Sequence, residues 1–377
     1  MSANTPPRSP EHERLAASND DLAPWRLWGP YVAGRQWGTV REDYSPDGDA
    51  WDYFPFEHAH RRAYRWGEDG IAGLCDRYGF LNLALALWNG HDDRLKERLF
   101  GVTNPQGNHG EDAKEYWWHL DATPTHSYAE YLYRYLQAAY PSTDLVAENG
   151  RRGKDDPEYE LSDTGVLAEE RFFDVTVVHA KDAFDDLVVE VRVINHGPEA
   201  APLDVVPQLW FRNTWAWGRD PRRPTIVSGR LAGRPALTAT HAWLGTYHLL
   251  AEDGPGGEPA LLLCDNETNL ERLWGPDAAT AGRPQPAHPK DAIDDAIVHG
   301  DASHLADGRG TKAAVWWHLD AVAPGDTVVL RLRLLSDAAA RREHADSGLV
   351  ERIGHGDRAR RSKRPDQTLR FAGKARR

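Results

Sequence analysis

A short stretch of the chain, residues 107–119, mixes glycines, histidines, carboxylates and an aromatic run: GNHGEDAKEYWWH. A second stretch, residues 60–73, has a similar mixture: HRRAYRWGEDGIAG. An enzyme that cleaves a glycosidic bond needs two carboxylic groups flanking that bond, about 5–5.5 Å apart for retention and about 6.5–9.5 Å apart for inversion. Both stretches supply carboxylates, so glycosidic bond cleavage is one chemistry that these residue types allow.

The candidate site residues come from these two stretches and from the segment that follows residue 119. We expect them to face a substrate or a docked partner: Arg65, Trp66, Glu68, Asp69, His109, Glu111, Asp112, Trp117 and His126. Glu115 is a further carboxylate in the same run. Adjacent residues of an extended chain point to opposite faces, so a working pair would have to combine one carboxylate from each stretch. The sequence does not show such a pair.

A structural role for these carboxylates is the alternative that we favour. Acidic side chains beside glycines cap turns and form ion pairs, and structural ion pairs collect in the same places as functional ones. The expected cationic partners are Arg61, Arg62, Arg65 and Lys114.

A metal site is the weaker interpretation of the histidines. His58 and His60 form an HxH pair of a type that binds zinc or iron, and His109 and Glu111 add two more ligand types. No complete ligand set can be read from the spacing, so we predict no metal. The sequence also lacks a phosphate-binding glycine loop, a dinucleotide fingerprint and a nucleophile elbow, and we predict no cofactor.

The composition limits the partners. The 377-residue chain has a formal net charge of −13, which argues against nucleic acid or an anionic membrane. Its fifteen tryptophans exceed ordinary usage. Most should lie in the core, but flat aromatic rings also stack on sugar rings. Carbohydrate is therefore the ligand class that the composition favours.

The compartment is predicted from what the sequence lacks. Cys75 and Cys264 are its only cysteines, so no disulfide framework is expected. No apolar run approaches the ~18–20 residues that span a bilayer. The first twenty residues lack the apolar segment of a secretory signal, and we expect a cytoplasmic protein.

Alternating hydrophobicity predicts a mainly β fold. Residues 81–90, LNLALALWNG, place leucines at period two and end in an Asn-Gly turn signal. Similar strands, separated by turn signals about every ten residues, continue to residue 336 and are typical of a β-sandwich. Residues 91–101 suggest a short helix or turn. The tyrosines of residues 126–140 fit neither period, so this segment is expected to be a helix or an extended connector.

The two ends differ from the middle of the chain. Residues 1–20 are rich in proline and charge, and residues 336–377 become basic and lose the strand period. We expect both tails to be disordered, with the β-sandwich domain at residues 21–335. A basic tail can bind anions, but a solvated tail without such a role is favoured because the rest of the chain is acidic.

Several long stretches resemble a known family. They are WGTVREDYSPDGDAWDYFPFEHAHRRAYRWGEDGIAG, LALALWNGHDDRLKERLFGVTNPQGNHGEDAKEYWWHLDATPTHSYAEYLYRY and VVPQLWFRNTWAW, with GTKAA and VAPGDTVVLRLRL near the end. Together they resemble the amino-terminal half of bacterial proteins related to glycoside hydrolase family 63. The resemblance covers residues 20–335, approximately.

The resemblance implies a large β-sandwich of the super-sandwich type, with a few short helices, that precedes an (α/α)6 barrel. It implies inverting hydrolysis of an α-glucosidic bond, with the acid and the base both in the barrel. Twelve helices of ~11–12 residues with connections of ~4–6 need roughly 190 residues. Only 42 residues follow position 335 (377 − 335). We therefore assign no catalytic residue here and expect the chain, truncated before the barrel, to be inactive alone.

The implied partners are a glucose-containing oligosaccharide and a separately encoded (α/α)6 barrel. Two alternatives remain open. The chain acts alone as a carbohydrate-binding β-sandwich module, or it is an interaction piece with an aromatic-rich face that packs on a barrel.

Overall fold

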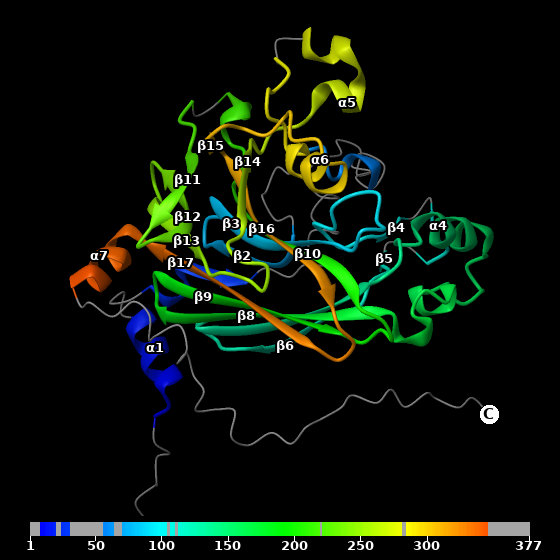
Figure 1. Ribbon diagram of the computed structural model, residues 1–377, viewed down its shortest axis with the longest axis horizontal. Helices are drawn as coiled ribbons and strands as arrows, with labels where there is room; N and C mark the ends of the chain where they lie inside the picture. The colour runs from blue at the N-terminus through cyan, green and yellow to red at the C-terminus, as the bar shows by residue number, and fades with distance from the viewer. Residues whose placement is uncertain are drawn as a thin grey trace, which may run out of the picture.

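The computed structural model describes residues 8–19, 24–30, 56–63, 70–103, 106–109, 112–218, 221–280 and 284–345 (Figure 1). Every strand pairing among them is antiparallel. Much of the first stretch that carries the family resemblance, residues 37–55 and 64–69, lies outside the described residues.

Two large sheets form the molecule. The first has six strands in the order β1 (Trp28–Pro30), β2 (Ile71–Asp76), β3 (Leu81–Trp88), β10 (Ala201–Phe211), β16 (Lys312–Val322) and β14 (Ala260–Cys264). The second has nine, in the order β15 (Arg309–Gly310), β11 (Thr225–Leu231), β12 (Arg234–His241), β13 (Gly245–Ala251), β17 (Thr327–Ser336), β9 (Asp186–Asn195), β8 (Phe172–Ala183), β7 (Tyr128–Leu136) and β6 (Trp117–Ala122). A separate pair joins β4 (Gly101–Val102) to β5 (Asp112–Ala113).

The helices of the described residues are short. They are α1 (Pro10–Asn19), α4 (Ser142–Arg151), α5 (Leu270–Trp274), α6 (Ala292–Val298) and α7 (Asp337–Ala345). Single 3-10 turns are η1 (Trp25–Leu27), η2 (Phe56–His58), η3 (Leu161–Thr164), η4 (Ala168–Glu170), η5 (Trp215–Trp217) and η6 (Pro276–Thr280). The expected mainly β class with a large β-sandwich and few helices is confirmed.

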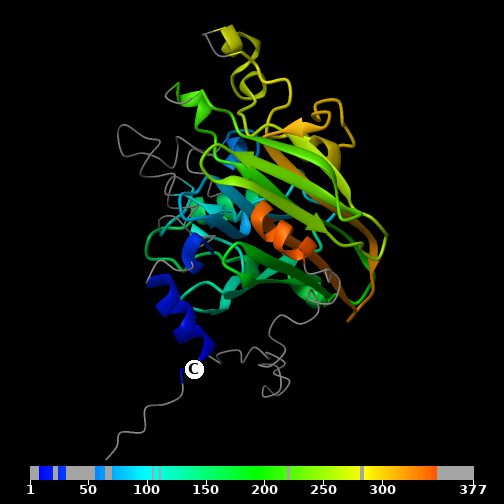
Figure 2. The ribbon, with the colours of Figure 1, turned by 90° about the vertical axis from the view of Figure 1, so that its left-hand side faces the viewer.

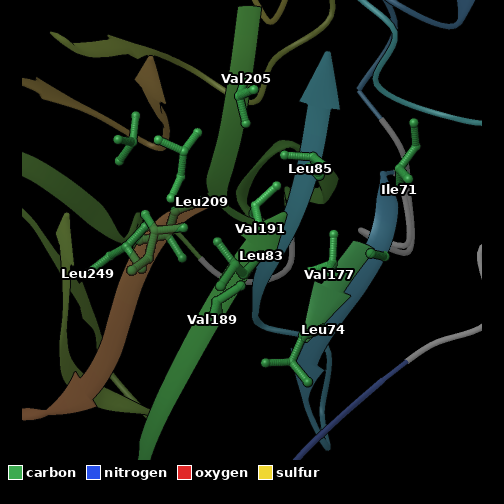
Figure 3. Close-up of a cluster of buried hydrophobic side chains, with 14 of the residues drawn as sticks. Ile71, Leu74, Leu83, Leu85, Val177, Val189, Val191, Val205, Leu209 and Leu249 are labelled. Atoms are coloured by element: carbon green, nitrogen blue, oxygen red, sulfur yellow. The ribbon is translucent and has the colours of Figure 1, made fainter. Parts of the chain in front are cut away.

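The core lies between the two sheets. Alternate residues of each strand point inward, as the period-two pattern predicts, and Figure 3 shows Leu83 and Leu85 of β3 near Val189 and Val191 of β9. Leu209 of the central strand β10 is fully buried in the same cluster. Burial of these aliphatic side chains from both sheets is what holds the sandwich together.

The ambiguous segment 126–140 is a strand. Tyr131, Tyr133 and Tyr135 run at period two and are each nearly fully buried. Tyr128 falls on the other face, which is why the four tyrosines together matched no period. Of the two alternatives for residues 91–101, the helix is absent: residues 91–94 form bends, and Lys96 pairs with Leu87 through backbone hydrogen bonds in both directions.

Part of each tail is ordered, contrary to the expectation of disorder. Glu11 of α1 is buried and accepts hydrogen bonds from the backbone N–H and the hydroxyl of Thr125, both at 2.8 Å. At the other end, α7 packs Ala339 and Ala340 on the outer face of β12, β13 and β17 (Figure 2). A buried carboxylate and an alanine face hold these helices although their composition is polar. The domain limits at 21 and 335 stay a prediction, and residues 346–377 lie outside the described part.

A buried histidine makes stability depend on pH. The Nε2–H of His179 donates to the Ala72 carbonyl at 3.0 Å, and burial lowers the pKa of His179 to about 4. An unfolded histidine titrates near pH ~6.5, so between these values the unfolded chain binds more protons than the folded one. We expect the free energy of unfolding to fall by up to about 3 kcal/mol as pH decreases from 6.5 to 4.

Urea titrations at several pH values measure this effect. His179→Gln keeps a donor for the Ala72 carbonyl but does not titrate. The variant should therefore show a flatter decline of stability between pH 6.5 and 4. An unchanged slope in the variant would assign the acid sensitivity to other groups.

Candidate functional site

Most of the carboxylates predicted for the site lie outside the described residues or show only their backbone. Arg65, Trp66, Glu68, Asp69 and Glu111 are not described, and Asp112 is placed in β5 without its side chain. His109, Trp117 and His126 are described, and the structure puts them in three different settings.

His109 lies on the exposed loop before β5. Its Nε2 is 2.8 Å from the carbonyl oxygen of Asp156, and the neighbouring Asn108 donates to the same carbonyl at 3.2 Å. These bonds tie the loop to the segment that follows α4. The contacts of His109 described here are therefore to backbone, which suits a loop anchor.

Trp117 begins β6 and packs on the sandwich. Its ring stacks on Tyr131 with centroids 6.0 Å apart and planes at 14°, and it is half-buried against the core. His119 meets the same tyrosine edge-on at 5.2 Å. Trp117 therefore packs on the sandwich through its contact with Tyr131.

His126 lies at the opposite end of the β6–β7 hairpin. It adopts a left-handed backbone conformation (φ 55°), and a Cβ on Gly29 would meet its Nδ1 at 2.4 Å. Burial, followed by the charges of Lys181 and Arg26, lowers its pKa. The structure therefore does not bring His126 together with Trp117, since the paired residues Trp117↔Tyr133 and Ala122↔Ala129 span the length of the hairpin between them.

The structural alternative holds for Glu115, but with different partners from those expected. Glu115 forms a 2.9 Å ion pair with Lys96 and accepts hydrogen bonds from the backbone N–H of Phe100 and the Tyr133 hydroxyl. Lys114, its chain neighbour, points instead to acids beyond α4: Glu158 at 3.2 Å and Glu160 at 3.4 Å. Arg61 lies 3.8 Å from Asp291.

A second polar group, missed in the sequence, lies on the outer face of the six-stranded sheet. Asn82 of β3 is paired with Trp210 of β10, which is paired in turn with Lys312 of β16. Asn82 is fully buried, and neither atom of its side-chain amide has a hydrogen-bond partner among the described residues. Buried polar atoms normally bond to protein or ordered water, so Asn82 departs from the usual pattern. In the sequence, Asn82 could have been noticed as the polar residue that shares one face of β3 with Ala84 and Ala86.

Helix α6 and its neighbours cover part of this outer face (Figure 1). We call their charged residues the α6 charge cluster and define it as Glu97, Arg272, Asp291, Asp294, Asp295 and Lys312. The Asp294 carboxylate accepts a 2.5 Å hydrogen bond from the Leu95 N–H. Burial raises the pKa of Asp294 to about 7, aided by nearby acids. A carboxyl with a raised pKa beside ionised carboxylates is a pattern found in active sites.

The partners of the cluster argue for a structural role. Arg272 lies 3.0 Å from Asp291 and 2.7 Å from Asp295. Lys312 lies 2.8 Å from Glu97. Each of these carboxylates is therefore held by a cation, and Asp294 is held by a backbone N–H.

Two acids of the cluster and His299, which follows α6, have metal-ligand chemistry. Atoms of Asp294, Asp295 and His299 lie within 4.8 Å of one another. The Arg272 guanidinium already contacts Asp295 and would repel a cation placed there. His58 packs edge-on against Trp274, and burial lowers the pKa of His60 to about 3. Neither histidine belongs to the group formed by Asp294, Asp295 and His299.

No family model matches the chain. The chain is 38% identical over 356 residues to "Uncharacterized protein YMR196W" of Saccharomyces cerevisiae (strain ATCC 204508 / S288c), a match that covers 87% of this chain and 32% of the relative. The chain thus spans about a third of the length of the curated relative that it matches.

Among solved structures, the "Putative aldose 1-epimerase (b2544)" of Escherichia coli K12 overlaps with 67% of this chain and 82% of its own, at 10% identity and a TM-score of 0.28. So low a score supports no conclusion about fold or function. In the described part of the chain, no helix has both the length and the apolar character needed to cross a bilayer.

Proposed function

We propose that this chain is the non-catalytic β-sandwich part of a larger carbohydrate-active system that resembles glycoside hydrolase family 63. A separately encoded (α/α)6 barrel would supply the acid and base that hydrolyse an α-glucosidic bond. The sandwich would hold one side of a glucose-containing oligosaccharide or support the barrel. Localisation in the cytoplasm belongs to the same proposal.

The observation that carries this proposal is the state of the buried carboxylates. A glycosidase acid must give up its proton to the leaving group and its base must be free to activate water. Glu115 and the acids of the α6 charge cluster are instead occupied by Lys96, Arg272, Lys312 and the Leu95 N–H. These groups stabilise the sandwich and its cover, which supports a system in which another part supplies the acid and the base. Glu68, Asp69 and Glu111 lie outside the described residues.

The matched length also supports the proposal. About two thirds of the yeast relative lies outside the match. The unmatched part of the relative is far longer than the roughly 190 residues that the twelve short helices of a barrel need.

An α-glucosidase assay on the purified chain tests whether the sandwich is non-catalytic and needs a separate barrel. We expect no glucose release from a panel of glucose disaccharides above a matched buffer blank. Hydrolysis should appear when the unmatched two thirds of the yeast relative is added as a separately expressed segment, or when that segment acts alone and the sandwich raises its rate. Turnover by the purified chain alone would overturn the proposal, and so would a segment that neither cleaves these sugars nor responds to the sandwich.

The stand-alone carbohydrate-binding module is the second candidate, favoured by exposed aromatic rings on this chain. It predicts sugar binding by the purified chain without any barrel. Sugar binding by the purified chain, with no effect of the added segment on hydrolysis, would favour the stand-alone module over the first candidate.

A further inference from the structure

Two turns from different sheets bring aromatic side chains together: Tyr78, Phe80 and His241 are in successive ring contact, and Trp243 follows His241 by two residues. Tyr78 and Phe80 belong to the turn between β2 and β3, and His241 and Trp243 lie at the turn between β12 and β13. We call these four residues the aromatic ridge. Ring centroids are 5.8 Å apart for Tyr78 and Phe80, and 4.5 Å apart for Phe80 and His241, whose planes are nearly parallel at 27°.

The ridge is fixed in its middle and open at its ends. His241 also stacks on the buried Phe211 at 5.6 Å, and its Nδ1 accepts a 3.1 Å hydrogen bond from the Trp243 N–H. Tyr78 is 58% exposed and Trp243 is 70% exposed, so they are two of the four large hydrophobic side chains that stand out from the described surface. A large apolar indole exposed to water at the tip of a hairpin is unfavourable, and covering it with a ligand would be favourable.

Guanidinium groups line the ridge. Arg77 lies over Tyr78 at 6.0 Å, Arg212 over Phe80 at 5.8 Å and Arg222 over Trp243 at 5.0 Å. Three of the four rings thus have a guanidinium near them, and a planar guanidinium presents several N–H donors along its edge. This arrangement places hydrogen-bond donors beside exposed apolar ring faces in a chain whose net charge is −13.

We propose that the aromatic ridge binds a neutral glucose-containing oligosaccharide, an inference that rests on the proposed carbohydrate function. The apolar faces of successive sugar rings would stack on Tyr78 and Trp243, and their hydroxyls would accept hydrogen bonds from the arginines. The two exposed rings, Tyr78 and Trp243, offer one stacking position at each of the two turns. A protein hot spot, in contrast, is a packed centre surrounded by a water-excluding rim.

Calorimetric titration of the full chain with maltotriose and with isomaltotriose tests the ridge. We expect binding of at least one of them, and Trp243→Ala should weaken it about tenfold, the effect of one lost stacking contact of ~1.4 kcal/mol. Arg222→Ala should weaken it less, because it removes donors but leaves the indole. Both positions are exposed, so the variants should fold, and matching circular dichroism spectra will establish that.

Trp274→Ala is the matched control. Trp274 is 50% exposed and has Arg62 over its ring at 5.8 Å, but it ends α5 and is not part of the ridge. Its replacement should leave the affinity unchanged. Equal losses in both tryptophan variants, full affinity in Trp243→Ala, or no binding up to millimolar sugar would each overturn the ridge as a sugar site.

Sedimentation of the same variants identifies a protein contact instead. Loss of self-association in Trp243→Ala without any sugar binding would make the ridge an interface between copies of the chain and reject the sugar proposal. These outcomes are independent of the reconstituted hydrolysis assay, which measures the barrel. If the ridge does not bind sugar, the proposal that a separate barrel supplies catalysis is not affected. If the hydrolysis assay fails, sugar binding to the ridge can still be measured.

Discussion

Replacing Glu115 by alanine should lower the free energy of unfolding by about 3–5 kcal/mol, the usual cost of removing one partner from a buried ion pair. The side chains of Lys96 and Glu115 are 1% and 3% exposed. The substitution strands the ammonium between the rings of Phe100 and Tyr140, at 3.8 and 4.1 Å from their centroids. It also leaves the Tyr133 hydroxyl without its acceptor. Urea denaturation followed by tryptophan fluorescence measures the loss.

Two further variants control this experiment. The double change Lys96→Met with Glu115→Leu removes both charges and should restore most of the stability, because well-packed apolar side chains often replace a buried ion pair at little cost. Glu148→Ala removes an acid from the surface pair with Arg151, whose own side chain is 73% exposed, and should leave the denaturation midpoint unchanged. A loss in Glu115→Ala no larger than in Glu148→Ala would contradict the structural role given to Glu115.

Replacing Leu209 by alanine should cost about 2–5 kcal/mol of unfolding free energy. Leu209 is fully buried in β10, between Leu83 of β3 and Ala313 of β16, and points into the core shared by the two sheets (Figure 3). Neighbouring strands fix the backbone on both sides, so the cavity cannot close easily. Xenon or benzene binding to the variant, together with urea denaturation, reports the cavity and its cost.

The matched control is Leu120→Ala. Leu120 belongs to the edge strand β6, which pairs only with β7 among the described strands, and its side chain is 45% exposed. The same chemical change there should alter stability by well under ~1 kcal/mol. Similar losses at both leucines would mean that the assigned core does not carry the stability of the sandwich.

Together with the assay of the isolated chain, these variants distinguish residues that stabilise the fold from residues that take part in catalysis. Glu115 was one of the carboxylates that the sequence offered to a glycosidase. If the loss of Glu115 lowers the free energy of unfolding as expected, a decrease of any activity in that variant gives no evidence of catalysis. The carboxylates of the α6 charge cluster need the same stability measurement before any activity loss is interpreted.

The sequence by itself determined the class of fold and most of its strands. Hydrophobic alternation is a local property, and it is read directly in β8 and β9, where buried residues mostly alternate with less buried ones. It is also read in β3 and β17, where leucines alternate with smaller or charged residues, although both faces of β3 are buried. It also showed that Asn82 interrupts an alanine face, although not what that face meets. Local reading failed at β7, where one tyrosine on the opposite face obscured the period, and at α1, whose order depends on Thr125 over a hundred residues away.

Only the tertiary structure decided which polar residues meet. Glu115 pairs with Lys96 while the adjacent Lys114 turns to Glu158, in the bend between β5 and β6. The aromatic ridge joins turns that lie more than 150 residues apart, because antiparallel sheets packed face to face bring their turns to common ends. Strand order and register set these encounters, and they follow from the packing of the whole chain, so no local pattern could have revealed them.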